Sequence, residues 1–424
     1  MSAEGPREES DPEPVDTRRN ILALGGDLAL FMLGLSFASQ TTVLPAFAAG
    51  LGASNLVIGA IPAVMTLGWF VPSLFAAGYT ETLPRRLPFV LRWTIWERVP
   101  YALLALTAFF VAGRAPGLAL AALLVLLLLT TGIGGVLMPA WMDIVGRTIP
   151  GRLRGRFFGI TSLAGSAGGM LGSAFTAWIL AVAPAPHGYG WCFVACTICM
   201  ALSFWALTLA REPSVGAPAP AVTLGAYLRR IPGLLRRDAD FSWFLVARSA
   251  IAAGGMATGF YTVFALRGLS AEAWHVGLFS AALFLGQSVG NLVLGWLADR
   301  AGHKLVLMIG ALALVIANGV ALAAPSLDAF SLVFALAGVQ HASVSVSNLN
   351  ALLEFAPRPE ERPTYVGLGL TAQGPVVFAA PLVAGALVDV VGFRAVFGLA
   401  SALSVVAVAL FATRVRDPRA ARRA

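Results

Sequence analysis

Charged residues are scarce in this 424-residue chain. Only 12% of its residues are Asp, Glu, Lys or Arg, whereas soluble globular domains contain about 25%. Hydrophobic residues make up 58% of the chain, and the mean hydropathy is +0.81. This composition excludes an ordinary soluble domain and predicts a protein that lies mostly within a membrane.

Lysine and clustered histidine are also lacking. Lys304 is the only lysine, and Leu305 follows it, so the chain has no Gly-Lys-Ser/Thr phosphate loop of the kind that P-loop ATPases need. The histidines form no His-Glu-x-x-His zinc signature, because they are scattered at His187, His275, His303 and His341. No nucleophile and base fall at a recognised catalytic spacing. We therefore expect no enzyme activity, no cofactor and no resident metal.

Cysteine is rare too, and its placement indicates packing. Cys192, Cys196 and Cys199 follow an i, i+4, i+7 spacing within one apolar segment, which places them on one face of a helix. A soft-metal site is conceivable there, but no other strong ligand is near in sequence. Buried cysteine usually behaves as a small apolar side chain, so we expect neither a metal site nor a disulfide.

Long apolar segments are abundant. About 20 residues are needed to cross a hydrocarbon core of about 30 Å as a helix, and in lipid the backbone must satisfy its own hydrogen bonds. The sequence therefore predicts an all-α membrane protein with twelve transmembrane helices. They are expected near residues 21–40, 55–78, 88–111, 117–142, 157–183, 189–210, 241–264, 275–298, 304–324, 329–353, 364–387 and 394–413.

The basic residues predict the orientation of these helices. Most arginines fall in the termini and in alternate loops, while the other set of loops has only Arg114, Arg267 and Arg394. Because cytoplasmic loops collect Lys and Arg, both termini are predicted to be cytoplasmic, in a plasma (inner) membrane. The net charge of +8 is spread over these loops rather than gathered on one face, so we expect membrane lipid but no nucleic acid as a partner.

The chain divides into two halves. Residues 21–210 and 241–413 are predicted to form two six-helix bundles, and the Pro-, Ala- and Arg-rich stretch 211–240 joins them. Within this linker, apolar and arginine residues alternate over 227–237, which indicates either a helix lying on the membrane surface or a plain solvated linker. Residues 1–20 are expected to be a disordered cytoplasmic tail rather than a cleaved signal, and residues 414–424 a basic cytoplasmic tail.

A charged turn bounded by glycines follows the eighth segment. It reads Gly295-Trp296-Leu297-Ala298-Asp299-Arg300-Ala301-Gly302-His303-Lys304. The turn after the second segment repeats the pattern loosely, with Glu81 at the place of Asp299 and with Arg85 and Arg86 at its basic end. We interpret these turns as gate loops.

The helix layout, the central linker and this turn resemble the major facilitator superfamily over about residues 18–415. The resemblance implies a transporter fold of two six-helix bundles related by pseudo-symmetry. It also assigns Asp299, Arg300, Gly302 and Lys304 to a cytoplasmic gate. His303 stands where the family usually has arginine, and the first-half copy departs from the family pattern at Ala77, Thr82 and Pro84.

The charged turn can act as a latch. Asp299 is expected to approach the N-terminus of the eleventh helix near Thr364 and Tyr365, where unpaired backbone N–H groups favour an anion. Glu81 and Arg156 would be the counterpart in the first half. In the alternative interpretation Asp299 only caps its turn, while the neighbouring basic residues anchor lipid headgroups.

Ionisable residues inside the predicted helices mark candidate functional positions, because charges within a bilayer are costly. Asp27 and Arg248 lie at similar depths in equivalent helices of the two halves, so a pairing across a central cavity is expected, with a structural ion pair near the surface as the alternative. Glu97 and Arg98 fall near the middle of the third helix. They suit either proton uptake and release or a fixed pair with each other or with Asp27.

Neutral polar side chains are expected near mid-depth on several helices. Those that could bind a solute are Gln287, Asn291, His341 and Gln373; Thr130, Thr131 and Tyr261 are further members, and each alone is more often a contact between helices. His341 is the best single candidate, because its titration range suits proton coupling.

The expected function is secondary active transport. We predict that the chain moves a small organic solute by alternating access, coupled to protons, with a slight preference for export of amphipathic compounds. A cation-coupled sugar importer of the same fold is an alternative. A membrane assembly or sensing protein that has lost transport is another.

Overall fold

The chain folds as a bundle of membrane-spanning helices. The computed structural model describes residues 16–213, 234–235, 237–323, 326–356, 358 and 361–418, and over these ranges it contains helices and no strands. Eleven of the described helical segments are long and apolar enough to cross a membrane. The last of them, Thr364–Thr413, is two helices, because Gly392 interrupts it with φ 83° and ψ 169°, a conformation that favours glycine. The predicted twelve spans are thus confirmed.

The first bundle contains seven helices and one π-helical turn. Ser54 begins its second span by accepting a hydrogen bond from the backbone N–H of Val57, as a helix N-cap does. The elements are α1 (Thr17–Phe37), α2 (Val43–Gly50), α3 (Asn55–Glu81), α4 (Leu87–Leu106), η1 (Thr107–Val111), α5 (Pro116–Thr148), α6 (Gly151–Val182) and α7 (His187–Thr208).

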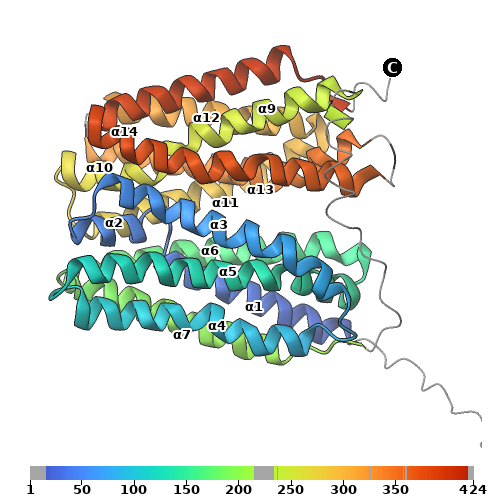
Figure 1. Cartoon of the computed structure of the whole chain (residues 1–424), viewed down its shortest axis with the longest axis horizontal. Coiled ribbons are helices and arrows are strands. Elements are labelled where there is room, and N and C mark those ends of the chain that lie inside the picture. The colour runs from blue at the N-terminus through green and yellow to red at the C-terminus, as the bar shows by residue number, and fades with distance from the viewer. Residues whose placement is uncertain are drawn as a thin grey trace, which may run out of the picture.

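The second bundle has the same plan, and Figure 1 shows it lying beside the first, in yellow to red against blue to green. Asp238 and Ser326 cap two of its helices through their side chains. Its elements are α9 (Ala239–Gly254), η2 (Gly255–Ala257), α10 (Thr258–Gly268), α11 (His275–Ala301), α12 (His303–Ala323), α13 (Leu327–Phe355) and α14 (Arg362–Thr413). Most of the predicted surface helix over 227–237 lies outside the described residues, as does most of each predicted tail.

The first span of each half is broken. α1 ends at Phe37 and α2 begins at Val43. Pro45 explains this break, because it has no N–H to bond the carbonyl group four residues earlier. That carbonyl, of Thr41, instead accepts the hydroxyl of Thr262 from the other half at 3.0 Å. The break therefore supplies a contact between the bundles.

The corresponding span of the second half is interrupted at η2. The paired glycines Gly254 and Gly255 stand at this point, and glycine weakens a helix. Gly254 also permits close packing, since a methyl group there would lie 2.2 Å from the Ser404 hydroxyl oxygen. Interrupted spans at equivalent positions of two repeats are typical of transporter binding sites.

The two halves are joined at one face and separate at the other. We call the face where α7 ends and α9 begins the linker face, which lies to the right in Figure 1. A single apolar cluster spans both halves toward the opposite face, including Phe47 of the first half and Phe279 of the second. Toward the linker face each cluster is confined to one half, around Leu24 in the first half and around Phe244 and Leu294 in the second.

Glycines allow the close approach at the opposite face. A methyl group on Gly59 would lie 2.2 Å from the Pro381 carbonyl oxygen, and one on Gly277 would lie 2.2 Å from the backbone nitrogen of Ala177. Each pair crosses between the halves, α3 with α14 and α11 with α6. Every hydrogen bond between the halves that we identify in the described residues lies toward this face, from Thr42–Ser280 to Arg267–Asn55.

Candidate substrate cavity and buried charge cluster

A central cavity of about 480 Å³ lies between the halves. It is built around both helix breaks, with Gln40 and Thr41 from the first break and Gly255 and Met256 from the second. None of its described lining residues is Asp, Glu, Lys or Arg. Its polar lining residues are Gln40, Thr41, Thr66, Thr258, Gln287, Gln340, His341, Ser345 and Gln373.

Several of these polar side chains have unused hydrogen-bonding capacity. Within the described part of the chain, the side chains of Gln40, Gln287, Gln340 and His341 make no hydrogen bond to another residue. Polar groups in a membrane interior are normally paired, because an unpaired group is costly. Four such side chains around one cavity therefore form a surface suited to a polar ligand.

The cavity lining combines polar and apolar side chains. Gln287 of α11 and Gln340 and His341 of α13 supply much of its polar part. Apolar side chains come mainly from the interrupted seventh span and from α3. They include Ile251, Met256, Phe260, Ile58 and Pro62. The arrangement fits a small amphipathic molecule without a net charge.

A second cavity leads from the central one toward the linker face. It has a volume of about 530 Å³, and Ser345 lines both cavities. Asn291 lines it as well, and its buried Oδ1 has no hydrogen-bond partner. The exposed Arg156 stands among its lining residues. The shared residue places the second cavity next to the central one, on the side of the linker face.

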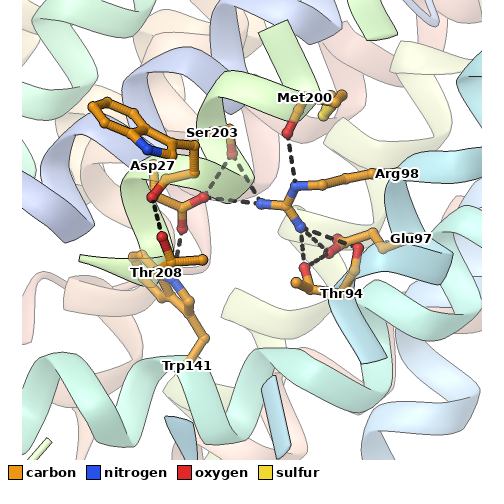
Figure 2. Close-up of polar contacts among 9 residues, drawn as sticks. Asp27, Thr94, Glu97, Arg98, Trp141, Met200, Ser203 and Thr208 are labelled. Atoms are coloured by element: carbon orange, nitrogen blue, oxygen red, sulfur yellow. Dashed lines mark hydrogen bonds and ion pairs between the residues drawn. The ribbon is translucent and has the colours of Figure 1, made fainter. Parts of the chain in front are cut away.

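A buried charge cluster lies within the first half (Figure 2). Arg98 of α4 donates from Nη2 to Asp27 Oδ1 of α1 at 2.9 Å and to Ser203 Oγ of α7 at 2.9 Å. Asp27 also accepts from Ser203 Oγ at 2.6 Å and from Trp141 Nε1 of α5 at 3.1 Å. Four helices thus hold one carboxylate, and the side chains of Asp27 and Arg98 are only 6% and 8% exposed.

Glu97 supplies a second carboxylate to the same cluster. Its Oε2 lies 3.3 Å from Arg98 Nη1 and accepts from Thr94 Oγ1 at 2.9 Å. The two acids and the guanidinium line a separate pocket of about 170 Å³, with Phe31 and Trp141 among its other walls. Two carboxyl groups share one guanidinium here, so the cluster carries one more negative than positive charge when both acids are ionised.

The contacts of Arg98 with Asp27 and with Glu97 are those of the fixed pairing that the sequence allowed. Proton uptake and release by Glu97 stays a prediction. The expected pairing of Asp27 with Arg248 is wrong. Arg98 reaches Asp27 within the same bundle, so no partner from the other half is needed.

Arg248 is bound by neutral groups in the second half. Its guanidinium donates to the Gly369 carbonyl oxygen at 3.1 Å, to Gln373 Oε1 at 2.6 Å and to Asn348 Oδ1. Its Nε is buried without a partner. Gln373 in turn lines the central cavity, so Arg248 lies directly behind the cavity wall.

Three predicted polar residues form contacts between or within helices. Thr130 donates to the Glu97 carbonyl oxygen, Thr131 to the Leu127 carbonyl oxygen, and Tyr261 to Asn318 Oδ1. Gln287, His341 and Gln373, by contrast, line the central cavity, as the sequence led us to expect. Gln40 and Thr41 also line the central cavity but were not predicted to do so. The polar run from Ser39 to Thr42, shortly before Pro45, was the available signal for the helix break.

The charged turn of the second half lies at the linker face. Gly302 ends α11 with φ 91°, and Asp299 and Arg300 are exposed. The Arg300 guanidinium stacks on the Trp296 ring at 4.1 Å, and Lys304 is half-buried at the start of α12. His303 is buried, and its ring contacts Ser347 Oγ at 3.1 Å and Glu354 Oε1 at 3.8 Å.

The first-half turn is arranged differently. Arg86 is buried and pairs with Asp143 at 2.9 Å, while its backbone N–H donates to Glu212 Oε2 at 2.7 Å. Arg85 is exposed. Glu81 ends α3, and its side chain lies outside what the structure describes, so its proposed role stays a prediction.

The N-terminal end of α14 has its own polar contacts. Tyr365 donates its hydroxyl to Asp238 Oδ2 at 2.9 Å. Arg237 pairs with Glu361 at 3.1 Å, and this hydrogen bonding raises the pKa of Arg237. The expected latch between Asp299 and the region of Thr364 and Tyr365 stays a prediction.

The cysteines pack in the core of the first half. Cys192, Cys196 and Cys199 are buried and free. Among the described residues, no group of three His, Cys, Asp or Glu side chains is placed to hold a metal ion. The close packing of Cys196 and Cys199 against Gly34 of α1 agrees with their interpretation as packing residues.

Comparisons with known proteins agree with this architecture. Residues 265–424 match the family model described as Major Facilitator Superfamily. A bacterial homologue of the iron transporter ferroportin, in an inward-facing state, is similar with a TM-score of 0.71 at 14% identity, covering 95% of this chain and 100% of that one. The D-xylose-proton symporter has a TM-score of 0.69 at 14% identity and covers 95% and 98%. A variant of the nucleoside transporter NupG has a TM-score of 0.69 at 16% identity and covers 94% and 100%. The TM-scores over nearly the whole chain establish the fold.

Proposed function

We propose that this chain, which resembles the major facilitator superfamily in its fold and matches that family's model over residues 265–424, is a secondary active transporter. It carries a small amphipathic solute by alternating access and couples this movement to protons. The observation that carries the proposal is the central cavity, whose lining combines apolar side chains with four polar ones that have no hydrogen-bond partner among the described residues. Export, which the sequence slightly favours, stays a prediction.

The position of the cavities supports alternating access. The predicted orientation makes the linker face cytoplasmic. The two connected cavities then lead to the cytoplasm, while glycine contacts and hydrogen bonds between the halves close the opposite face. This is an inward-facing arrangement. Transport requires the two bundles to rock, so that the opposite face opens while the linker face closes.

The charge cluster supports proton coupling. Asp27 and Glu97 share the single guanidinium of Arg98, which leaves one uncompensated negative charge inside the bundle. Such a charge is costly in a membrane interior, and binding of a proton removes it. Glu97 is the proposed proton site, because Asp27 already accepts from three side chains while Glu97 Oε2 has only Thr94 and a longer contact with Arg98.

The test is solute-driven proton movement. The purified chain is reconstituted in liposomes that enclose the pH-sensitive dye pyranine, and solute gradients are imposed across a panel of uncharged amphipathic compounds and sugars. We expect at least one amphipathic compound to drive proton flux. Glu97→Gln should abolish this flux and retain exchange of labelled solute for unlabelled solute, because exchange needs no net proton movement. Asp328→Asn, at an exposed position on α13, is the matched control.

The other outcomes separate the alternatives. Flux that requires sodium and a sugar would favour the cation-coupled sugar importer. Absence of flux and exchange across the panel would contradict the transport proposal and favour an assembly or sensing role. Proton flux that survives in Glu97→Gln would remove Glu97 as the proton site.

A further inference from the structure

A buried guanidinium stands beside the central cavity without an acid to neutralise it. Arg248 is 1% exposed, and no Asp or Glu in the described ranges contacts it. All three of its hydrogen-bond acceptors are neutral groups, from Gly369, Asn348 and Gln373. The Phe244 ring lies under the guanidinium at 5.5 Å. The positive charge is therefore spread over dipoles and a ring face but is not cancelled.

Gln373 separates this charge from the cavity. A guanidinium has only donors, so the amide that receives it must present its oxygen. Gln373 Oε1 therefore faces Arg248, and the amide nitrogen is 3.4 Å from the Arg248 carbonyl oxygen. Because the amide nitrogen donates one N–H to the Arg248 carbonyl oxygen and Gln373 also lines the cavity, its second N–H is what remains for a solute. A solute thus meets an N–H donor with a positive charge behind it.

We infer that Arg248 is a specificity-determining residue, whose field makes the central cavity reject organic cations and admit uncharged or anionic solutes. The inference rests on the proposed transport function and names the charge class that its cavity accepts. No acidic side chain among the described lining residues offsets the field. The buried acids of the first half, Asp27 and Glu97, line a different pocket. In a low-dielectric interior such a field is weakly screened.

The test measures this field without needing a substrate. Val344 lines the cavity one helical turn from Asn348. The Val344→Cys chain is purified and reacted with two methanethiosulfonates, the cationic 2-(trimethylammonium)ethyl reagent and the anionic 2-sulfonatoethyl reagent. Each rate constant is divided by its value for free 2-mercaptoethanol. The natural chain is the blank, since its three cysteines are buried.

We expect the normalised ratio of the anionic to the cationic rate constant to be roughly ten. Adding Arg248→Met should bring the ratio close to one. Adding Arg248→Lys should preserve it, because the charge remains although lysine cannot hold both amides in the same way. Arg114→Met removes the same charge from an exposed loop and should leave the ratio unchanged. The retained effect in the lysine variant separates the charge from a structural role of the arginine.

Three results would overturn the inference. One is a ratio near one in the Val344→Cys chain with Arg248 intact. This result contradicts the inference even if the Arg248→Met variant fails to fold. Another is an equal ratio with and without Arg248. The third is no reaction with either reagent, because Val344 would then face no open cavity. Since labelling requires no transport, a high ratio in a chain without solute flux would contradict the proposed function alone.

Discussion

Asp389 of the second half caps the N-terminus of α3 in the first half. Its Oδ1 accepts from the Asn55 backbone N–H and its Oδ2 from that of Leu56, each at 3.3 Å, and Asn55 Nδ2 adds a bond of 2.7 Å. A carboxylate is favourable at a helix N-terminus because of the partial positive charge there. Arg267 strengthens the junction by donating to the Ala53 carbonyl oxygen at 2.9 Å. These contacts close the opposite face.

Replacing this cap should open the opposite face more often. Asp389→Asn removes the charge, and the loss of a helix cap costs about 0.5–2 kcal/mol. The equilibrium should therefore shift several-fold toward the state open at this face. The measurement is the rate at which a membrane-impermeant maleimide, added outside intact cells, labels Thr258→Cys in the central cavity. We expect faster labelling than in the Thr258→Cys parent.

The matched control for this change is Asp328→Asn. Asp328 is an exposed acid in the first turn of α13, with no contact between the halves. It should leave the labelling rate unchanged. Equal rates in Asp389→Asn and in the parent would show that the cap does not hold the face closed.

A methyl group at Gly59 should also prevent the two halves from closing at the opposite face. In Gly59→Ala the new Cβ would lie 2.2 Å from the Pro381 carbonyl oxygen, well inside van der Waals contact, so α3 and α14 must separate. We expect loss of solute flux in liposomes together with faster outside labelling of Thr258→Cys. Gly50→Ala is the control, since no atom lies within 4 Å of its added Cβ. Normal flux in Gly59→Ala would show that this close approach is dispensable.

The sequence predicts the spans well and the contacts between them less well. All twelve predicted segments correspond to helices. The apolar runs are long, and in lipid the backbone must form its hydrogen bonds within each run. The ends differ by a few residues, as at α5, which continues to Thr148 beyond the predicted residue 142. Such ends extend past the apolar core, where polar residues are equally compatible with helix or loop.

Partner choice was harder to predict, because it depends on which helix faces meet. Asp27 and Arg248 occupy equivalent depths, which suggested their pairing, but the rotation of α4 brings Arg98 to Asp27 instead. The capping role of Asp389 has no local signal, since Asn55 lies more than three hundred residues away. The interrupted first span had a signal in Pro45, whereas its contact with Thr262 could come only from the assembled bundles.

The charge cluster should behave as one energetic unit. Arg98→Met leaves Asp27 and Glu97 buried without their cation, and breaking a buried ion pair costs about 3–5 kcal/mol. Asp27→Asn should also lower stability, because it weakens the acceptor that Arg98, Ser203 and Trp141 share. The double variant should lose less than the sum of the two, by about 0.5–3 kcal/mol. Thermal unfolding of the four proteins in detergent measures this coupling. Additive losses would mean that the two side chains act independently.

Asp299 offers the sharpest test of the predicted latch at the linker face. It lies exposed at the end of α11, and a role confined to capping its own turn predicts normal transport by Asp299→Asn. A latch predicts impaired transport, because the neutral amide interacts more weakly with the N-terminus of α14 when the linker face closes. The measurement is solute flux per reconstituted molecule, with membrane expression recorded alongside. Asp328→Asn, an exposed acid remote from this face, is the control and should transport normally. Full flux in Asp299→Asn would remove the latch and leave headgroup anchoring by the neighbouring basic residues as the role of this turn.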